Sequence, residues 1–232
     1  MSRRAMLAMA ALLLFASAAG AQSPGEEVFR RGAVEIDVGG LWNAGLPMGT
    51  ARATLTGNQQ GTPPVTFFET SSQVEPAAGY EGRVSVFLSR AFAVEGAFRY
   101  ARPRLETSIT GDFEDAPDVT ATRDVSQYVF EINGVAHLNR LRFGGGGVPF
   151  VFGGGGYLRE LYEGRQIAET GQVYQAGGGV KILFRQSSMT LLKGVGVRLD
   201  ARLLMRRGGV ELDDDEPLRT YGAAAGSLVL VF

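Results

Sequence analysis

Apolar and polar residues alternate along most of the chain from about residue 33 onward. The clearest example is FAVEGAFRY at 92–100, where Glu95 and Arg99 share one face and Phe92, Phe98 and Tyr100 share the other. Successive side chains of a β-strand point to opposite faces, so this period of two predicts a strand with one apolar and one charged face.

Eight segments follow this pattern and predict an all-β chain. They span 33–42, 79–88, 92–100, 125–138, 149–159, 172–184, 195–204 and 219–232. If the strands run up and down, connections 43–78, 101–124, 160–171 and 205–218 lie at one end, and the shorter 89–91, 139–148 and 185–194 lie at the other. Long connections at one end and short ones at the other are typical of a closed, antiparallel, eight-stranded transmembrane β-barrel.

The first residues predict a cleavable signal peptide. Arg3 and Arg4 precede an apolar run at 5–16, and the small residues Ala19-Gly20-Ala21 follow it. A charged region, a short apolar region and an A-x-A-like site together are the mark of secretion. We therefore expect a signal peptide at 1–21 and one barrel domain at 22–232; an uncleaved helical anchor is the alternative.

The apolar face of the barrel points either inward, as in a soluble ligand-binding barrel, or outward to lipid. Several segments reach the roughly 9–11 residues that a tilted transmembrane strand needs. When alternate strands are drawn up and down, the aromatic residues of the apolar faces sort into two rings, as in the girdles of membrane barrels. The rings contain Trp42, Tyr80, Tyr100, Tyr128 and Tyr174 at one end, and Phe92, Phe150, Phe152, Phe184 and Phe232 at the other. This sorting favours the outward orientation.

The last strand, RTYGAAAGSLVLVF at 219–232, places Leu228, Leu230 and Phe232 on one face and ends on an aromatic residue. It resembles the terminal strand of bacterial outer-membrane β-barrels, which implies recognition by the barrel assembly machinery. The whole mature chain resembles the OmpA/OmpX-type eight-stranded outer-membrane β-barrel family. The resemblance implies contact with outer-membrane lipid and lipopolysaccharide, and both termini in the periplasm. It transfers no catalytic residue, and the chain leaves no room for OmpA's peptidoglycan-binding domain.

With the apolar face outward, the charged face lines the lumen. Its acids and bases are nearly balanced: Glu35, Asp37, Glu95, Glu131 and Asp200 against Arg83, Arg99, Arg159, Lys181, Arg198 and Arg202. An eight-stranded barrel is only wide enough for side chains to fill, and buried charges must pair. We therefore expect a charge-plugged, non-enzymatic protein that contributes to envelope integrity or to surface interaction through its loops; the alternative is a narrow channel for small solutes or ions.

Other chemistry finds little support in the sequence. The chain has no cysteine and a formal net charge of −1, which disfavour disulfides, thiolate sites and nucleic-acid binding. Outer-membrane lipid A deacylases resemble this barrel in size and use a His, a Ser and an acid that face the lipid. Here the residue two along from His137 is Asn139 rather than Ser, which makes a lipid-modifying enzyme the less favoured alternative. The acidic runs at 112–118 and 211–216 lack EF-hand spacing, so we expect solvated loops, no metal site and no cofactor.

Overall fold

The structure is a computed structural model that describes residues 29–55, 65–112, 117–142, 146–162, 167–186, 191–208 and 218–232. The predicted signal peptide, Glu114, Asp115 and the acidic run at 211–216 lie outside these ranges. The elements are β1 Val34–Asn43, β2 Leu46–Leu55, β3 Val65–Val74, β4 Ala77–Phe87, β5 Phe92–Ala101, β6 Arg104–Thr110, β7 Val119–His137, the 3₁₀ turn η2 Asn139–Leu141, β8 Gly147–Tyr162, β9 Ile167–Gln186, β10 Gly194–Gly208 and β11 Arg219–Val231.

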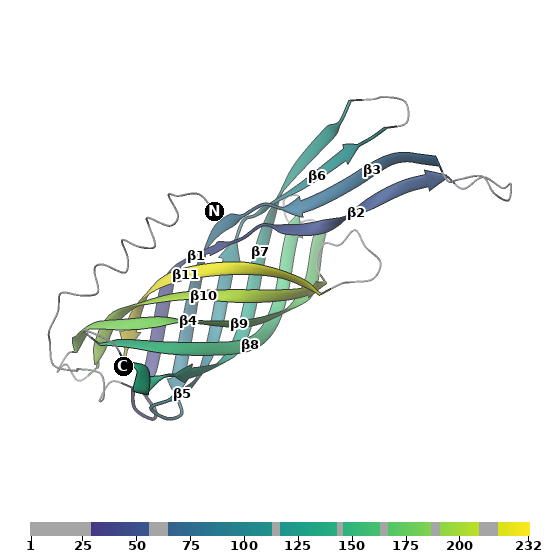
Figure 1. Ribbon diagram of the computed structural model, residues 1–232. Helices are drawn as coiled ribbons and strands as arrows, with labels where there is room; N and C mark the ends of the chain where they lie inside the picture. The colour runs from purple at the N-terminus through teal and green to yellow at the C-terminus, as the bar shows by residue number, and fades with distance from the viewer. Residues whose placement is uncertain are drawn as a thin grey trace, which may run out of the picture.

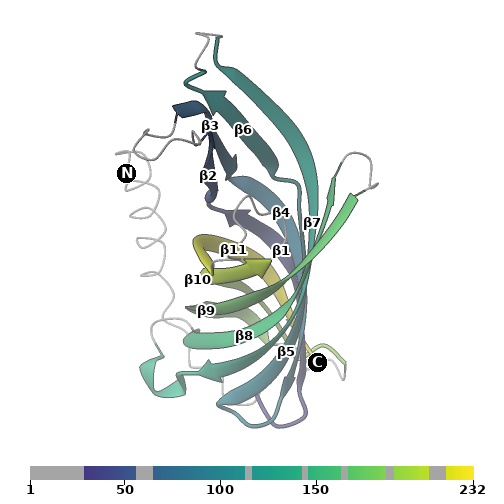
Figure 2. The ribbon, with the colours of Figure 1, turned by 90° about the vertical axis from the view of Figure 1, so that its right-hand side faces the viewer.

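Eight of these strands form a closed ring (Figures 1 and 2). Each strand is antiparallel to both neighbours in the order β7-β5-β4-β1-β11-β10-β9-β8, and β8 pairs with β7 to close the ring. Each predicted strand corresponds to one of these eight, so the closed antiparallel barrel is confirmed. Closure matters physically because it leaves no strand edge unpaired in the wall.

The remaining strands form an extension above one end of the barrel, and they correct the sequence prediction. Connections 43–78 and 101–124 were expected to be loops, but they contain β2, β3, β6 and the first residues of β7. β2 pairs with β3, β3 with β6, and β6 with Val119–Asp124 of β7 (Figure 2). These strands are rich in Ser and Thr, which hides their alternation. We call this the extension, its end of the barrel the upper end, and the end at Phe232 the lower end.

The two faces of the extension differ in chemistry. One face carries polar cross-strand pairs, including Arg52 with Glu69 at 3.1 Å and Gln73 with Glu106 at 3.3 Å. Oppositely charged or hydrogen-bonded side chains that face each other on neighbouring strands stabilise a sheet by about 0.2–1 kcal/mol per pair. On the other face Val74 and Leu105 pack against the apolar cluster at the barrel mouth. The extension is therefore continuous with the barrel in both backbone and packing.

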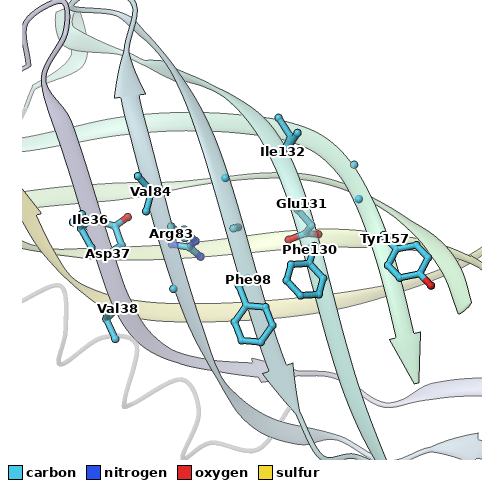
Figure 3. Close-up of a pocket in the computed structure, with 15 residues that line it drawn as sticks. Ile36, Asp37, Val38, Arg83, Val84, Phe98, Phe130, Glu131, Ile132 and Tyr157 are labelled. Carbon is cyan, nitrogen blue, oxygen red and sulfur yellow. The ribbon is translucent and has the colours of Figure 1, made fainter. Parts of the chain in front are cut away.

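The wall alternates between exposed apolar and buried charged side chains. Ile132 is 69% exposed and Phe184 is 67% exposed, whereas Glu35 and Glu95 are 0% exposed. Figure 3 shows this alternation on β7, where Phe130 and Ile132 flank the inward Glu131. The apolar face therefore lies outside. Among the described residues, no helix is long and apolar enough to cross a membrane.

On strand β8 the inward and outward faces are the reverse of those predicted. Phe150, Phe152 and Leu158 lie inside the barrel, and Tyr157 and Arg159 lie outside. The predicted placement of Phe150 and Phe152 in an outer girdle is wrong, and so is that of Arg159 in the lumen. The reason is that both faces of this strand are apolar near residue 150, and the glycine run at 153–156 carries no side chains that mark a face.

Candidate functional site: a charge-filled lumen

Arg198 on β10 is the centre of the lumen's charge network. Its guanidinium contacts Asp37 Oδ2 at 3.1 Å and Asp200 Oδ2 at 3.2 Å, and it also pairs with Glu95. These carboxylates come from β1, β10 and β5, so one arginine joins three sides of the ring. Asn133 Nδ2 donates to the other oxygen of Glu95 at 3.2 Å, which fixes that carboxylate further.

Asp200 connects Arg198 to two further arginines. Arg83 on β4 lies 3.2 Å from Asp200 Oδ2, and Arg202 on β10 lies 2.5 Å from Asp200 Oδ1. Both arginines also pair with Glu81, the Arg202 contact being 3.1 Å. Each cation therefore faces at least two anions, an arrangement in which buried charges offset one another's loss of hydration.

Two further pairs extend the network across the barrel. Arg99 Nη2 donates to Glu131 Oε1 at 2.5 Å, and Gln175 Nε2 donates to Glu131 Oε2 at 3.1 Å. Lys181 on β9 pairs with Glu35 on β1, 146 residues away in sequence. Arg99–Glu131 joins the neighbouring strands β5 and β7, whereas Lys181–Glu35 joins strands that are not neighbours in the ring.

Above the network lies a layer that combines one ion pair with an apolar cluster. Arg206 donates from Nη1 and Nη2 to the two oxygens of Glu160, at 2.7 and 2.6 Å. This two-point geometry is the strong form of an arginine–carboxylate contact. The surrounding cluster consists of Leu46, Met48, Val129, Leu158, Val173, Leu204, Tyr221 and Ala223. The upper end of the lumen is therefore closed to water by packed side chains.

The lower end is closed by aromatic rings. Phe29 lies before β1 and is 1% exposed; its ring stacks on Phe87 at 5.2 Å and on His137 at 5.3 Å. Lys181 Nζ lies 5.3 Å from the centre of the Phe150 ring, and Arg198 Cζ lies 4.5 Å from it. A cation over an aromatic face is stabilised by the ring's quadrupole. This explains why Phe150 lies inside the barrel rather than in an outer girdle.

Glycines on β8 make room for the side chains that fill the lumen. A Cβ at Gly154 would lie 2.3 Å from Asn133 Oδ1, and a Cβ at Gly156 would lie 2.7 Å from Glu131 Cγ and 1.9 Å from the carbonyl oxygen of Phe130. The glycine run therefore has a packing role, since it lets β8 lie against β7 where the network's side chains project.

The structure brings together most of the predicted lumen charges. Ten of the eleven are buried inside, and Arg159 is the exception. Four further charges were missed, namely Glu81, Glu160, Arg206 and Arg219. Glu81 precedes Arg83 by two residues, so its phase alone identifies it. With these additions, the buried charges among the residues that the structure describes are seven acids and seven arginines or lysines, so their formal charges cancel.

His137 is buried among aromatic rings, with no serine or carboxylate hydrogen-bonded to it in the described structure. Across the described part of the chain, no group of three or more His, Cys, Asp or Glu side chains is placed to hold a metal ion. The site is a packed polar core in which each end is sealed by apolar side chains.

The aromatic residues of the outer wall lie near its two ends. Trp42, Tyr80 and Tyr174 are exposed on the outside toward the upper end, and Tyr100 and Tyr128 are partly exposed there. Toward the lower end, Phe92 and Phe184 are exposed and Phe232 is partly exposed. Tyr157 joins the upper group in place of the two phenylalanines of β8.

The terminal strand completes the ring at β1. Val38 pairs with Leu228 and Ile36 with Leu230, and the amide of Phe232 donates to the carbonyl oxygen of Val34 at 2.8 Å. Leu228 faces outward and is 51% exposed. The segment expected to serve as the assembly signal therefore forms part of the closing seam, with Leu228 on the outer surface.

No protein-family model matches the sequence, and no curated protein matches it. The solved structures that this chain resembles include two outer-membrane proteins. The outer membrane protein OprG from Pseudomonas aeruginosa is 10% identical with a TM-score of 0.50, over 91% of this chain and 99% of OprG. Ail, the attachment invasion locus protein of Yersinia pestis, is 15% identical with a TM-score of 0.40, over 87% of this chain and 99% of Ail. Together with the closed strand ladder, the likeness to OprG shows that this chain has the fold of an eight-stranded outer-membrane β-barrel.

Proposed function

We propose that the protein is a non-enzymatic barrel of the outer membrane whose lumen is plugged by its own ion pairs. The observation that carries this proposal is the division of the wall, with apolar side chains exposed outside and charges buried inside. A water-soluble barrel of this kind would expose a large apolar surface to water, which monomeric soluble proteins avoid.

The height of the wall supports residence in a bilayer. Tyr174 and Phe184 mark the two ends of the outward face of β9, ten residues apart. Ten residues of strand span about 33 Å, which is about 25 Å along the membrane normal at the usual tilt. This matches the apolar band of about 25 Å that outer-membrane barrels show. On this reading a leader at 1–21 directs export and both termini are periplasmic.

The extension then lies at the cell surface and is the part offered for interaction. It projects beyond the barrel mouth (Figure 1), and one of its faces exposes Phe68, Ile109 and Val119. We propose that envelope integrity and surface contact, rather than transport or catalysis, are the roles of this protein.

Fractionation tests the location. Expressed with its leader in a Gram-negative host, the protein is expected in the outer-membrane fraction and to migrate differently on gels before and after boiling. Recovery of a soluble periplasmic protein would contradict the proposal.

Planar bilayers test the plug, and with it the narrow-channel alternative. The purified protein is expected to show no steady single-channel conductance, because both ends and the middle of the lumen are filled. The double variant Arg99→Ser/Glu131→Ser removes one ion pair from the middle of the lumen and leaves both end layers in place, so it serves as the comparison with a less filled middle. Steady conductance by the unmodified protein would establish the channel instead.

A further inference from the structure

Two outward-facing arginines interrupt an otherwise uncharged outer wall. Leaving aside Val119–Asp124 of β7, which belongs to the extension, the described outward positions of the barrel strands carry charge only at Arg159 on β8 and Arg207 on β10, and both are exposed. Both lie at the upper ends of their strands. An arginine facing lipid is tolerated near the membrane surface and strongly unfavourable at mid-depth, so their height is that of the lipid head groups.

The strand registers bring these arginines to one small area. Tyr157, Gln172 and Arg207 form a row across β8, β9 and β10, and Arg159 and Thr170 form the next row up. Strands that are next but one to each other lie about 10 Å apart. A groove of about 370 Å³ lies over this area, lined by Tyr157, Thr170, Gly171, Gln172, Arg207 and Gly208.

The polar groups of the groove favour an anion. Tyr174 Oη donates to Gln172 Oε1 at 2.9 Å, which leaves the amide nitrogen of Gln172 as a donor. Thr170 and Tyr157 add hydroxyl groups, and no carboxylate lines the groove. Arg207 lines the groove, and Arg159 lies beside it, opposite Thr170, without an ion pair in the described structure. Guanidinium groups with additional donors match the geometry and charge of a phosphate.

The groove adjoins an apolar hollow in the outer wall. This hollow has a volume of about 840 Å³, and Tyr157 lines both it and the groove. The outward side chains of Phe98, Phe130 and Ile132 line it (Figure 3), and Gly82 and Gly96 are also part of its lining. A polar, cationic groove above an apolar hollow fits a molecule with a phosphate head and acyl tails.

We propose that Arg159 and Arg207, with Gln172 between them, bind the phosphate of a phosphorylated glycolipid in the outer leaflet, and that its acyl chains lie toward the hollow. This inference rests on the proposed membrane location. A lipid is favoured over free phosphate because the groove opens onto the membrane-facing wall beside Tyr157 and Tyr174, the height at which aromatic residues meet head groups.

Native mass spectrometry of the folded protein in detergent tests the site. The probe is lipid A carrying two phosphates, and the comparison ligand is the same lipid with its phosphates removed. Because each basic residue near an anionic surface contributes about 1 kcal/mol, Arg159→Gln and Arg207→Gln are each expected to weaken binding of the phosphorylated lipid about fivefold, and the double variant about thirtyfold. Arg159→Lys/Arg207→Lys keeps both charges and is expected to retain most of the binding.

The matched control is Arg30→Gln/Arg140→Gln, which removes two exposed positive charges at the lower end and is expected to bind like the unmodified protein. Equal binding by the Arg159→Gln/Arg207→Gln variant and the unmodified protein overturns the proposal, as does displacement of the lipid by millimolar inorganic phosphate. Only protein with the heat-modifiable band of a folded barrel is compared. A failure of this site is therefore distinct from a failure of the membrane location, which fractionation measures separately.

Discussion

Replacing Arg198 with Met tests the charge network most directly. Arg198 pairs with Asp37, Glu95 and Asp200, and all four side chains are 1% exposed or less. Methionine has similar length but no charge, so the carboxylates lose a shared cation and cannot regain hydration. Removing one partner of a buried ion pair destabilises a protein by about 3–5 kcal/mol. A loss of about 4 kcal/mol increases the unfolding equilibrium constant about a thousandfold.

The assay is urea unfolding in lipid vesicles, followed by the fluorescence of Trp42, the single tryptophan of the chain. The matched control is Arg52→Met, which breaks the exposed Arg52–Glu69 pair, with side chains 66% and 38% exposed. An exposed pair contributes at most about 1 kcal/mol, so this variant is expected to unfold nearly as the unmodified protein does. Equal losses of unfolding free energy in the two variants would refute the view that buried pairing stabilises the lumen.

Three further changes give distinct outcomes. Gly156→Val is expected to prevent barrel formation, since its Cβ would lie 1.9 Å from the carbonyl oxygen of Phe130, whereas Gly96→Val has open space around its Cβ and is expected to fold. The two variants are compared by whether their migration on gels changes with boiling, and a folded Gly156→Val protein would contradict the expectation. Ile132→Arg places a charge on the lipid-facing wall and is expected to lower the unfolding free energy by about 2–4 kcal/mol; no change in urea midpoint would argue that this face is not in lipid. Phe150→Ala removes a buried ring beneath two cations and is expected to lower the unfolding free energy by about 3–5 kcal/mol. A loss below about 1 kcal/mol would show that this ring is not part of the aromatic packing that closes the lower end of the lumen.

The sequence alone predicts which face of a strand points into the lumen wherever charged residues occupy one of the two faces. On β5, Glu95 and Arg99 are four residues apart and therefore lie on the same face of the strand, and both point into the lumen as predicted. On β8 no charge marks a face until Arg159 and Glu160, one of which is outside and the other inside. The prediction stopped at Arg159 and therefore placed it in the wrong set.

The sequence predicts which charged residues lie in the lumen better than it predicts which of them form ion pairs with one another. Lys181 on β9 pairs with Glu35 on β1, and Arg206 on β10 pairs with Glu160 on β8, so neither pair joins strands that are direct neighbours in the ring. Which side chains meet there depends on how far neighbouring strands are staggered around the barrel, and that stagger is a property of the whole ring. The extension was missed for a related reason, since β3 and β6 are strands because they pair with each other rather than because either has a strong pattern.

Strand β7 belongs to two structures at once. It pairs with β6 near Val119 and continues without a break to His137, where it pairs with β5 and β8. A molecule that pulls or tilts the extension would therefore load the same backbone that closes the ring at β8. Mechanical force at the tip reaches the seam through covalent bonds, with no flexible joint along β7 to absorb it.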